Sequence, residues 1–281
     1  MLRTFLLLSV LFLFVGATVK KIGDVPDDLK EISGWDFLND STIVAHNDSG
    51  NEAKLYVLNL DGSVRHKCDI KNTTNVDFED ISCDDKGNIY LGDFGNNLNM
   101  RKDLVIYKIK AAKVNNNEDI EPKKIHFSYS EQTEFPPKKS ELNFDCEAMA
   151  YHNDSLFLFT KCRTEPFDGK CMVYKIPTKP GSYVLKRKTY FIVEKRDWYR
   201  DAVTAADIRN NELFLLTYNR VIKYTFENNK PKYVEHQTLL PISQKESLCI
   251  HEKTGVLFVA DEKTKFIGGN IYTIDFTKKK K

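Results

Sequence analysis

The chain has 281 residues, of which 41% are hydrophobic and 29% are charged, and its 42 basic residues nearly balance 40 acidic ones, for a net charge of +2. This composition excludes intrinsic disorder, collagen and a membrane protein with several spans, because it supplies apolar side chains for a core and only one long apolar run. The near balance of charge offers no broad basic face, so we expect no nucleic-acid partner.

The apolar run lies at the N-terminus, from Leu2 to Gly16, with Arg3 near its start and small residues at its end. This pattern is typical of a secretory signal peptide. We therefore expect residues 1–17 to be a signal peptide and residues 18–281 to form a single secreted domain. A retained membrane anchor is the weaker alternative, because the run is short for a membrane span.

Cysteines and glycosylation motifs fit this extracellular destination. Six cysteines lie in the expected mature part, and an even number in an oxidising compartment suggests disulfides. Cys162 and Cys171 flank a polar loop, so a disulfide between them would close a hairpin, while the other pairings stay open. Four Asn-X-Ser/Thr motifs, at Asn39, Asn47, Asn72 and Asn153, predict a glycoprotein if the host is eukaryotic.

Short apolar segments separated by Gly, Asn and Asp dominate the mature part, and none has a sustained helical period, so we expect an all-β protein. The segments recur as five units of four strands. The second unit is the clearest, with Glu79–Ile81, Asn88–Gly92, Leu104–Tyr107 and Lys124–Phe127. A four-stranded repeat of this kind is the signature of a β-propeller blade.

The fifth unit ends after its third strand, Asn270–Thr273. Val19–Ile22 at the start of the mature chain would supply the missing strand and close the ring, so we predict a five-bladed β-propeller closed by its N-terminal strand. A sixth blade within the long segment 131–143 is the alternative. Trp35 and Trp198 are expected to pack in the core between blades.

The first strand of each blade lines the central channel of a propeller. Aligned on their apolar residues, the units place an oxygen-bearing side chain at one level of the channel in every blade: Ser33, Glu79, Glu147, Thr204 and Glu246. Two residues earlier, on the same face of each strand, stand Glu31, Asp77, Asp145, Ala202 and Gln244.

Carboxylates in a narrow channel repel one another unless a cation neutralises them. We therefore predict a metal ion on the axis, with Ser33, Glu79, Glu147, Thr204 and Glu246 as its ligands. Hard oxygen ligands suit Ca²⁺ best, and Mg²⁺ or Mn²⁺ fit less well. The alternative is that these residues only cap strands or turns.

Loops that follow the second strand of each unit collect polar residues at one end of the channel. His46, Asp48 and Asp93 are the candidate catalytic residues there, with His46 or Asp48 as a general base beside the metal. Lys161, Arg163, Tyr218, Arg220, Asp261 and Glu262 follow at the same position of the later units. Ordinary turn formation is the alternative role of the Asn-Asp-Ser-Gly and Gly-Asn-Asn segments.

The segments 77–81 (Asp-Phe-Glu-Asp-Ile), 92–97 (Gly-Asp-Phe-Gly-Asn-Asn) and 47–51 (Asn-Asp-Ser-Gly-Asn) resemble a family of mostly bacterial secreted β-propeller proteins with D-W-E-D-I-A, G-D-I-G-D-N and N-D-S-G-N repeats. Segments 145–149, 203–208 and 246–248 fit the same family. The resemblance implies the propeller fold and little about activity, since the family is largely uncharacterised.

More distantly, the ring order Ser, Glu, Glu, Thr, Glu is similar to the calcium ligands of five-bladed calcium-dependent apyrases, which hydrolyse nucleoside di- and triphosphates. Segment 46–50 keeps an Asp but lacks the Arg that apyrases carry in this loop.

Three functional hypotheses follow. We favour a secreted calcium-binding module whose loop-rich mouth recognises an extracellular protein or glycan, because the sequence shows no complete catalytic set. A metal-dependent hydrolase of small-molecule esters, lactones or nucleotide phosphates is the alternative, and a purely structural secreted protein is the third.

Overall fold

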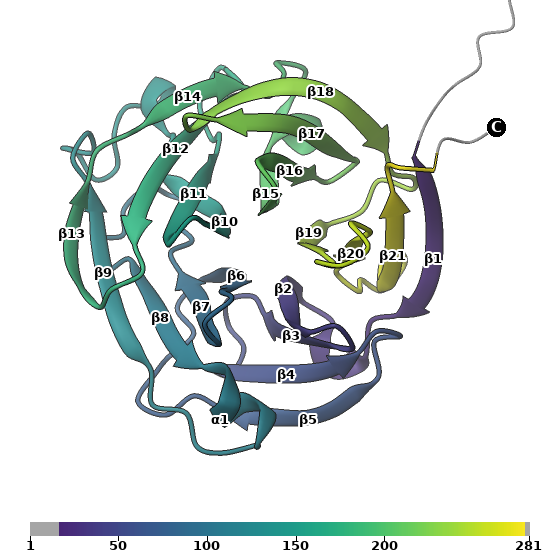
Figure 1. Cartoon of the computed structure of the whole chain (residues 1–281). Coiled ribbons are helices and arrows are strands. Elements are labelled where there is room, and N and C mark those ends of the chain that lie inside the picture. Colours follow the sequence, from purple (N-terminus) through teal and green to yellow (C-terminus); the bar gives the residue numbers. More distant parts are fainter. Residues whose placement is uncertain (1–16, 279–281) are drawn as a thin grey trace, which may run out of the picture.

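The computed structural model describes residues 17–278, so the expected signal peptide lies outside the described residues apart from Ala17. Five β-sheets stand around a central channel, one sheet for each blade (Figure 1). The all-β, five-bladed propeller is therefore confirmed. Across the described part of the chain, no helix has the length and apolar character needed to span a membrane.

In each blade the strands lie side by side, and the first strand is nearest the channel and the last is farthest from it. Blade 1 contains β2 (Ile32–Asn39), β3 (Thr42–Asn47), β4 (Lys54–Asn59) and β5 (Val64–Asp69). Blade 2 contains β6 (Phe78–Cys83), β7 (Asn88–Asp93), β8 (Val105–Lys110) and β9 (Lys123–Tyr129). Blade 3 contains β10 (Asp145–His152), β11 (Ser155–Lys161), β12 (Lys170–Pro177) and β14 (Thr189–Ile192).

Blade 4 contains β15 (Val203–Arg209), β16 (Glu212–Thr217), β17 (Arg220–Glu227) and β18 (Lys230–Thr238). Blade 5 contains β19 (Lys245–Ile250), β20 (Leu257–Asp261), β21 (Asn270–Asp275) and β1 (Thr18–Asp24). The short helices are η1 (Asp27–Leu29), α1 (Ala111–Asn115), η2 (Lys139–Glu141) and α2 (Trp198–Asp201).

The N-terminal strand closes the ring as the sequence predicts. β1 is the outermost strand of blade 5 and pairs antiparallel with β21, Thr18 opposite Asp275 and Asp24 opposite Asn270. One strand was not predicted: β13 (Gly181–Leu185) leaves blade 3 and pairs parallel with β9 at the outer edge of blade 2. The segment 131–143 holds only η2, so the sixth blade is wrong.

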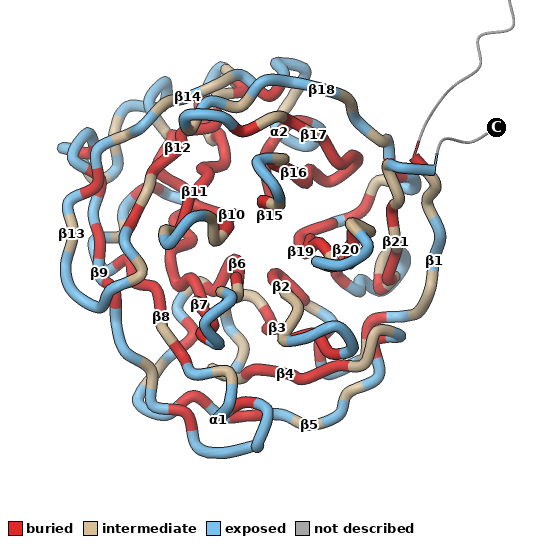
Figure 2. Tube along the Cα trace, viewed as in Figure 1, coloured by how far each residue is buried: buried red, intermediate tan, exposed pale blue. Residues whose placement is uncertain are grey.

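The core lies between neighbouring blades, where the inner strands are buried and the outer strands keep one face in solvent (Figure 2). Tyr90, Tyr129 and Tyr174, for example, belong to one apolar cluster between blades 2 and 3. Trp35 packs in another cluster and is 1% exposed, as expected. Trp198 does not: 48% of its surface is exposed, so its predicted core position is wrong.

Three aspartates, one buried and two half-buried, tie the inner strands of adjacent blades together. Asp80 accepts hydrogen bonds from the backbone N–H of Ile81 in its own strand and from that of Met149 in blade 3, both at 2.8 Å. Asp36 links blades 1 and 2, and Asp207 links blades 4 and 5, in the same way. These bonds fix the inner strands relative to one another, and the channel residues with them.

All six cysteines are free, so the expected Cys162–Cys171 disulfide is wrong. The Cys162 Sγ lies 3.2 Å from Thr164 Oγ1 and from Asp168 Oδ1 in its own loop. Cys171 instead packs into the apolar cluster between blades 3 and 4. The two thiols therefore have different surroundings, one polar and one apolar.

Candidate metal centre

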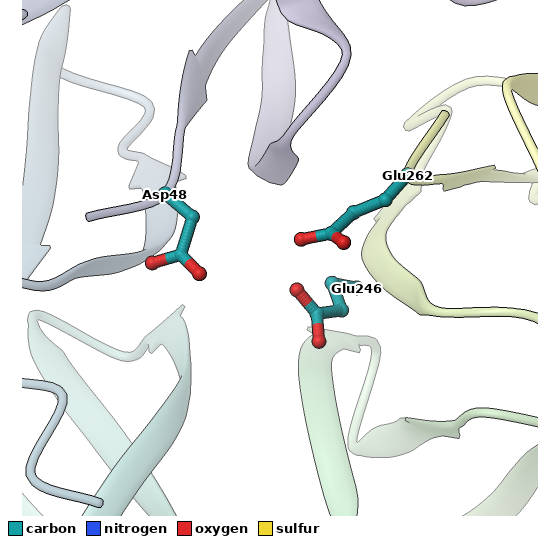
Figure 3. A group of neighbouring side chains, drawn as sticks. All are labelled: Asp48, Glu246 and Glu262. Atoms are coloured by element: carbon teal, nitrogen blue, oxygen red, sulfur yellow. The ribbon is translucent and has the colours of Figure 1, made fainter. Parts of the chain in front are cut away.

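Carboxyl groups gather at the end of the channel where the inner strands begin. Three sets of acids have ligand atoms within 4.8 Å of one another: Asp48, Glu246 and Glu262 (Figure 3); Asp48, Asp77 and Glu79; and Glu79, Asp145 and Glu147. Asp48 and Glu79 each belong to two sets, so the seven acids form one connected group, which we call the axial acid cluster.

The backbone explains why the predicted ring faces the channel. In every inner strand the pairing register shifts at the ring position: between Ile32 and Gly34, Phe78 and Ile81, Cys146 and Ala148, Val203 and Ala205, and Lys245 and Ser247. A β-bulge adds an unpaired residue and re-aims its side chain. Ser33, Glu79, Glu147, Thr204 and Glu246 thus occupy equivalent bulges in the five blades.

The ring residues divide into two kinds. Glu79, Glu147 and Glu246 all enter the axial acid cluster, although no single set contains all three. The hydroxyls of Ser33 and Thr204 donate instead to backbone carbonyls of the next blade, those of Glu79 at 2.8 Å and Lys245 at 2.7 Å. A hydroxyl that donates its hydrogen keeps its oxygen lone pairs, so these bonds are compatible with a ligand role.

Two basic residues neutralise one side of the cluster. The Lys161 Nζ lies 2.8 Å from Glu147, and the Arg163 guanidinium lies 3.0 Å from Glu147 and 2.6 Å from Asp145. Lys161 also donates to the Tyr218 hydroxyl at 3.0 Å. The remaining carboxyls, on blades 1, 2 and 5, have no such ion pair within the cluster, so uncompensated negative charge is concentrated there.

Glu79 shows this imbalance most clearly. It is only 4% exposed, yet its carboxyl accepts no hydrogen bond from any residue that the structure describes. Burial and the neighbouring Glu147 hold the pKa of this carboxyl well above its usual value. A nearly buried carboxylate with no donor among the described residues is costly, so the group is stabilised by a proton, by water in the channel or by a cation.

On the other side of the cluster, the carboxyl groups also have raised pKa values. Burial raises the pKa of Asp48 to about 7, and burial together with Glu246 raises that of Glu262 to about 9. Figure 3 shows the Asp48, Glu246 and Glu262 side chains directed toward one another. Oxygen atoms gathered in this way could hold an ion.

These shifts predict an unusual pH dependence of stability for the chain in the presence of a chelator. A carboxyl with a raised pKa binds more protons when folded than when unfolded, so its contribution is full at low pH and is lost as pH rises. For Asp48 the loss falls between 3.8 and about 7, and for Glu262 between 4.5 and about 9. Melting temperatures measured with chelator should therefore fall from pH 5 to pH 9, and a flat or rising profile would contradict the assignment.

The three candidate catalytic residues have different positions. Asp48 joins the axial acid cluster from the loop after β3. His46 is fully buried beside Phe78, and its Nδ1 lies 3.1 Å from the Asn47 carbonyl oxygen. Burial lowers the pKa of His46 to about 4. His46 therefore does not contact a solute in the channel.

Asp93 is also withdrawn from the channel. It is 1% exposed, pairs with Arg101 at 2.9 Å and accepts the backbone N–H of Asp77 at 3.1 Å. Its role in this structure is to hold the start of the inner strand of blade 2.

Four members of the cluster were not among the predicted ligands: Asp48, Asp77, Asp145 and Glu262. Asp77 and Asp145 stand two residues before ring residues, and Asp48 and Glu262 follow the second strands of blades 1 and 5. The period of two was visible in the sequence and would have placed Asp77 and Asp145 here, whereas the loop positions of Asp48 and Glu262 did not fix their distance from the axis. The neutralising partners of Glu147 had no such signal.

Comparison with known proteins shows the fold. No model of a known protein family matches the chain, and no curated protein matches it in sequence. Among solved structures it is similar to a glutaminyl cyclase from Myxococcus xanthus (9% identity, TM-score 0.57), covering 92% of this chain and 97% of that one. A luciferin-regenerating enzyme has 12% identity and a TM-score of 0.55, covering 94% and 97% of the two chains.

A putative gluconolactonase has 8% identity and a TM-score of 0.51, covering 92% of each chain. At these identities the likenesses establish the β-propeller architecture and nothing of the chemistry. The resemblance to the secreted repeat family accordingly remains a prediction. The chain is a five-bladed β-propeller with the fold of several enzymes and an acidic cluster at one end of its channel that could hold an ion.

Proposed function

We propose that this chain is a secreted calcium-dependent hydrolase that cleaves a small ester or lactone at the axial acid cluster. The observation that carries the proposal is the excess of seven converging carboxyls over two basic partners, with Glu79 4% exposed and accepting no hydrogen bond at its carboxyl from a described residue. Repeated bulges present three of these groups, Glu79, Glu147 and Glu246, from the inner strands, so their convergence is part of the blade design rather than a chance meeting of surface acids.

Calcium fits the cluster better than other metals. All seven groups offer carboxylate oxygen, and calcium takes six to eight oxygen ligands in flexible geometry, whereas Mg²⁺ demands a near-ideal octahedron and retains water. The only nearby imidazole of the predicted site, His46, is buried away from the channel, which disfavours metals that prefer nitrogen. Asp48, Asp77, Glu79, Glu246 and Glu262 are the ligands that we assign.

The same end of the channel holds the other groups that hydrolysis needs. A bound calcium ion would polarise the carbonyl of an ester. Asp48 is only half-buried, so its carboxylate can also contact water at the mouth and accept its proton. The Arg163 side chain, 23% exposed, can pair with the carboxylate product.

A substrate panel tests this proposal. The mature chain is assayed with δ-valerolactone, a sugar δ-lactone, phenyl acetate and ADP, each with calcium and with a chelator. Turnover of an ester or lactone that disappears on chelation is expected, and lactones come first because a putative gluconolactonase shares the fold. Turnover of ADP alone would replace ester hydrolysis with phosphohydrolysis, and turnover of none would contradict the proposal.

The second candidate is a calcium-stabilised recognition module for an extracellular protein or glycan. Its support is a set of exposed apolar residues on loops at the same end of the propeller: Val76, Leu98, Met100, Leu240, Phe266 and Ile267. Apolar residues gathered around one opening mark contact surfaces. Calcium binding without turnover across the panel would favour this function.

A further inference from the structure

Helix α2 presents two aromatic side chains to solvent beside the axial acid cluster. Trp198 is 48% exposed and Tyr199 is 39% exposed. Their rings lie 6.1 and 5.4 Å from the ring of Tyr218, centroid to centroid, and 5.7 Å from each other. We call these three residues the aromatic ledge.

The ledge is continuous with the cluster. The Tyr218 hydroxyl donates to Glu246 at 3.2 Å and accepts from Lys161 at 3.0 Å. Ring contacts therefore lead from the exposed Trp198, which meets Tyr218 edge to face, to a carboxylate that we assign to calcium. A molecule resting on the outer rings would place its neighbouring atoms near the cluster.

The helix that carries the ledge is held rigidly. Asp201, at its end, is buried and accepts hydrogen bonds from Arg196 at 2.7 Å and from Arg220 at 2.8 Å. Asp197 caps the first turn by accepting the Arg200 backbone N–H at 2.9 Å. A backbone turn that is held in place before a ligand arrives loses little conformational freedom on binding, which favours affinity.

The chemistry around the rings indicates a hydroxylated ring as the ligand. Exposed aromatic faces stack on flat apolar surfaces, and a pyranose presents one such face of C–H groups with hydroxyls around its rim. The ledge is bordered by the exposed Asp197–Arg200 ion pair and by Arg163, which can bond hydroxyls. These side chains already form ion pairs with Asp145, with Glu147 and with each other, and a hydroxylated ligand would add hydrogen bonds to them that a purely apolar ligand cannot make.

We propose that the aromatic ledge is a subsite for a pyranose ring, so that the substrate is a sugar lactone or a sugar ester. The assignment of a substrate rests on the proposed hydrolase function, whereas the sugar subsite itself does not depend on turnover. The experiment therefore measures binding first and hydrolysis second.

Tryptophan fluorescence reports on the ledge directly. The chain has two tryptophans, and Trp35 is 1% exposed, so iodide quenches chiefly Trp198. Methyl glycosides of glucose, galactose and mannose are titrated in turn, with glycerol as the open-chain control. We expect one glycoside to protect Trp198 from iodide saturably, and Trp198→Phe, which removes the accessible fluorophore, serves only to show that the quenched signal comes from Trp198. Absence of protection by all three, equal protection by glycerol, or protection by phenol alone would overturn the subsite.

Kinetics then separate the subsite from the hydrolase. Trp198→Ala should raise KM for a sugar δ-lactone about three- to tenfold, the effect of one lost ring contact. The same change should leave KM for δ-valerolactone unaltered. The control variant Tyr233→Ala, at an exposed tyrosine of the outer strand β18, should leave KM for both lactones unaltered. Sugar protection without turnover would reject the hydrolase and keep the subsite. Turnover in which Trp198→Ala changes KM equally for both lactones would reject the subsite and keep the hydrolase.

Discussion

Asp48→Asn is expected to lower kcat/KM for the hydrolysed ester or lactone at least about 100-fold at saturating calcium, because a positioned general base contributes roughly 10²- to 10⁴-fold. Asparagine keeps the shape of aspartate but cannot accept the proton of water. The fold should survive the change, since Asp48 lies in a loop and its carboxyl accepts only the neighbouring Ser49 N–H among described residues.

Asp85→Asn is the matched control, because Asp85 lines a cavity of about 640 Å³ that also includes Asp36 and Asp207, away from the axial acid cluster. The control should retain wild-type activity. A loss of less than about threefold in Asp48→Asn would remove this residue from the chemistry.

Calcium should raise the melting temperature of the wild-type chain by roughly 5–10 °C. A ligand present at 100 times its dissociation constant adds about 2.7 kcal/mol to the free energy of unfolding, and about 1 kcal/mol shifts a domain of this size by roughly 2–4 °C. Glu79→Gln should abolish most of this gain, because it removes a charge from the centre of the cluster.

In chelator, Glu79→Gln should not lower the melting temperature relative to wild type. Without a cation, the Glu79 carboxyl is buried against Glu147 and Asp48 without a donor, so a neutral glutamine should leave the fold as stable as wild type or more stable. Glu227→Gln, on an exposed position of β17, is the control and should follow wild type in both conditions. Equal melting temperatures with and without calcium in the wild-type chain would argue against the site.

The repeat in the sequence was sufficient to predict the five blades, the closing strand and the ring positions. Ser33, Glu79, Glu147, Thr204 and Glu246 recur in phase with the apolar residues of each unit, and the structure places each at the bulge of its inner strand. Local pattern predicts such features because every blade repeats the same order of strands, although the loops between them differ in length.

Features that depend on the paths of loops could not be predicted in this way. How near Asp48 and Glu262 come to the axis depends on loop conformation after β3 and β20, for which the sequence carries no period. β13 pairs with a strand of another unit, and Trp198 lies on a single helical turn within a loop. The ion pairs that neutralise Glu147 likewise appear only when blade 3 is assembled.

A crystal structure of the mature chain grown with calcium tests the central claim most directly. We predict one calcium ion on the channel axis, with oxygen atoms of Glu79 and Asp48 about 2.3–2.6 Å from it and others of the cluster completing six to eight ligands. Density for water alone between these carboxyls at millimolar calcium, or calcium bound only elsewhere on the propeller, would contradict it.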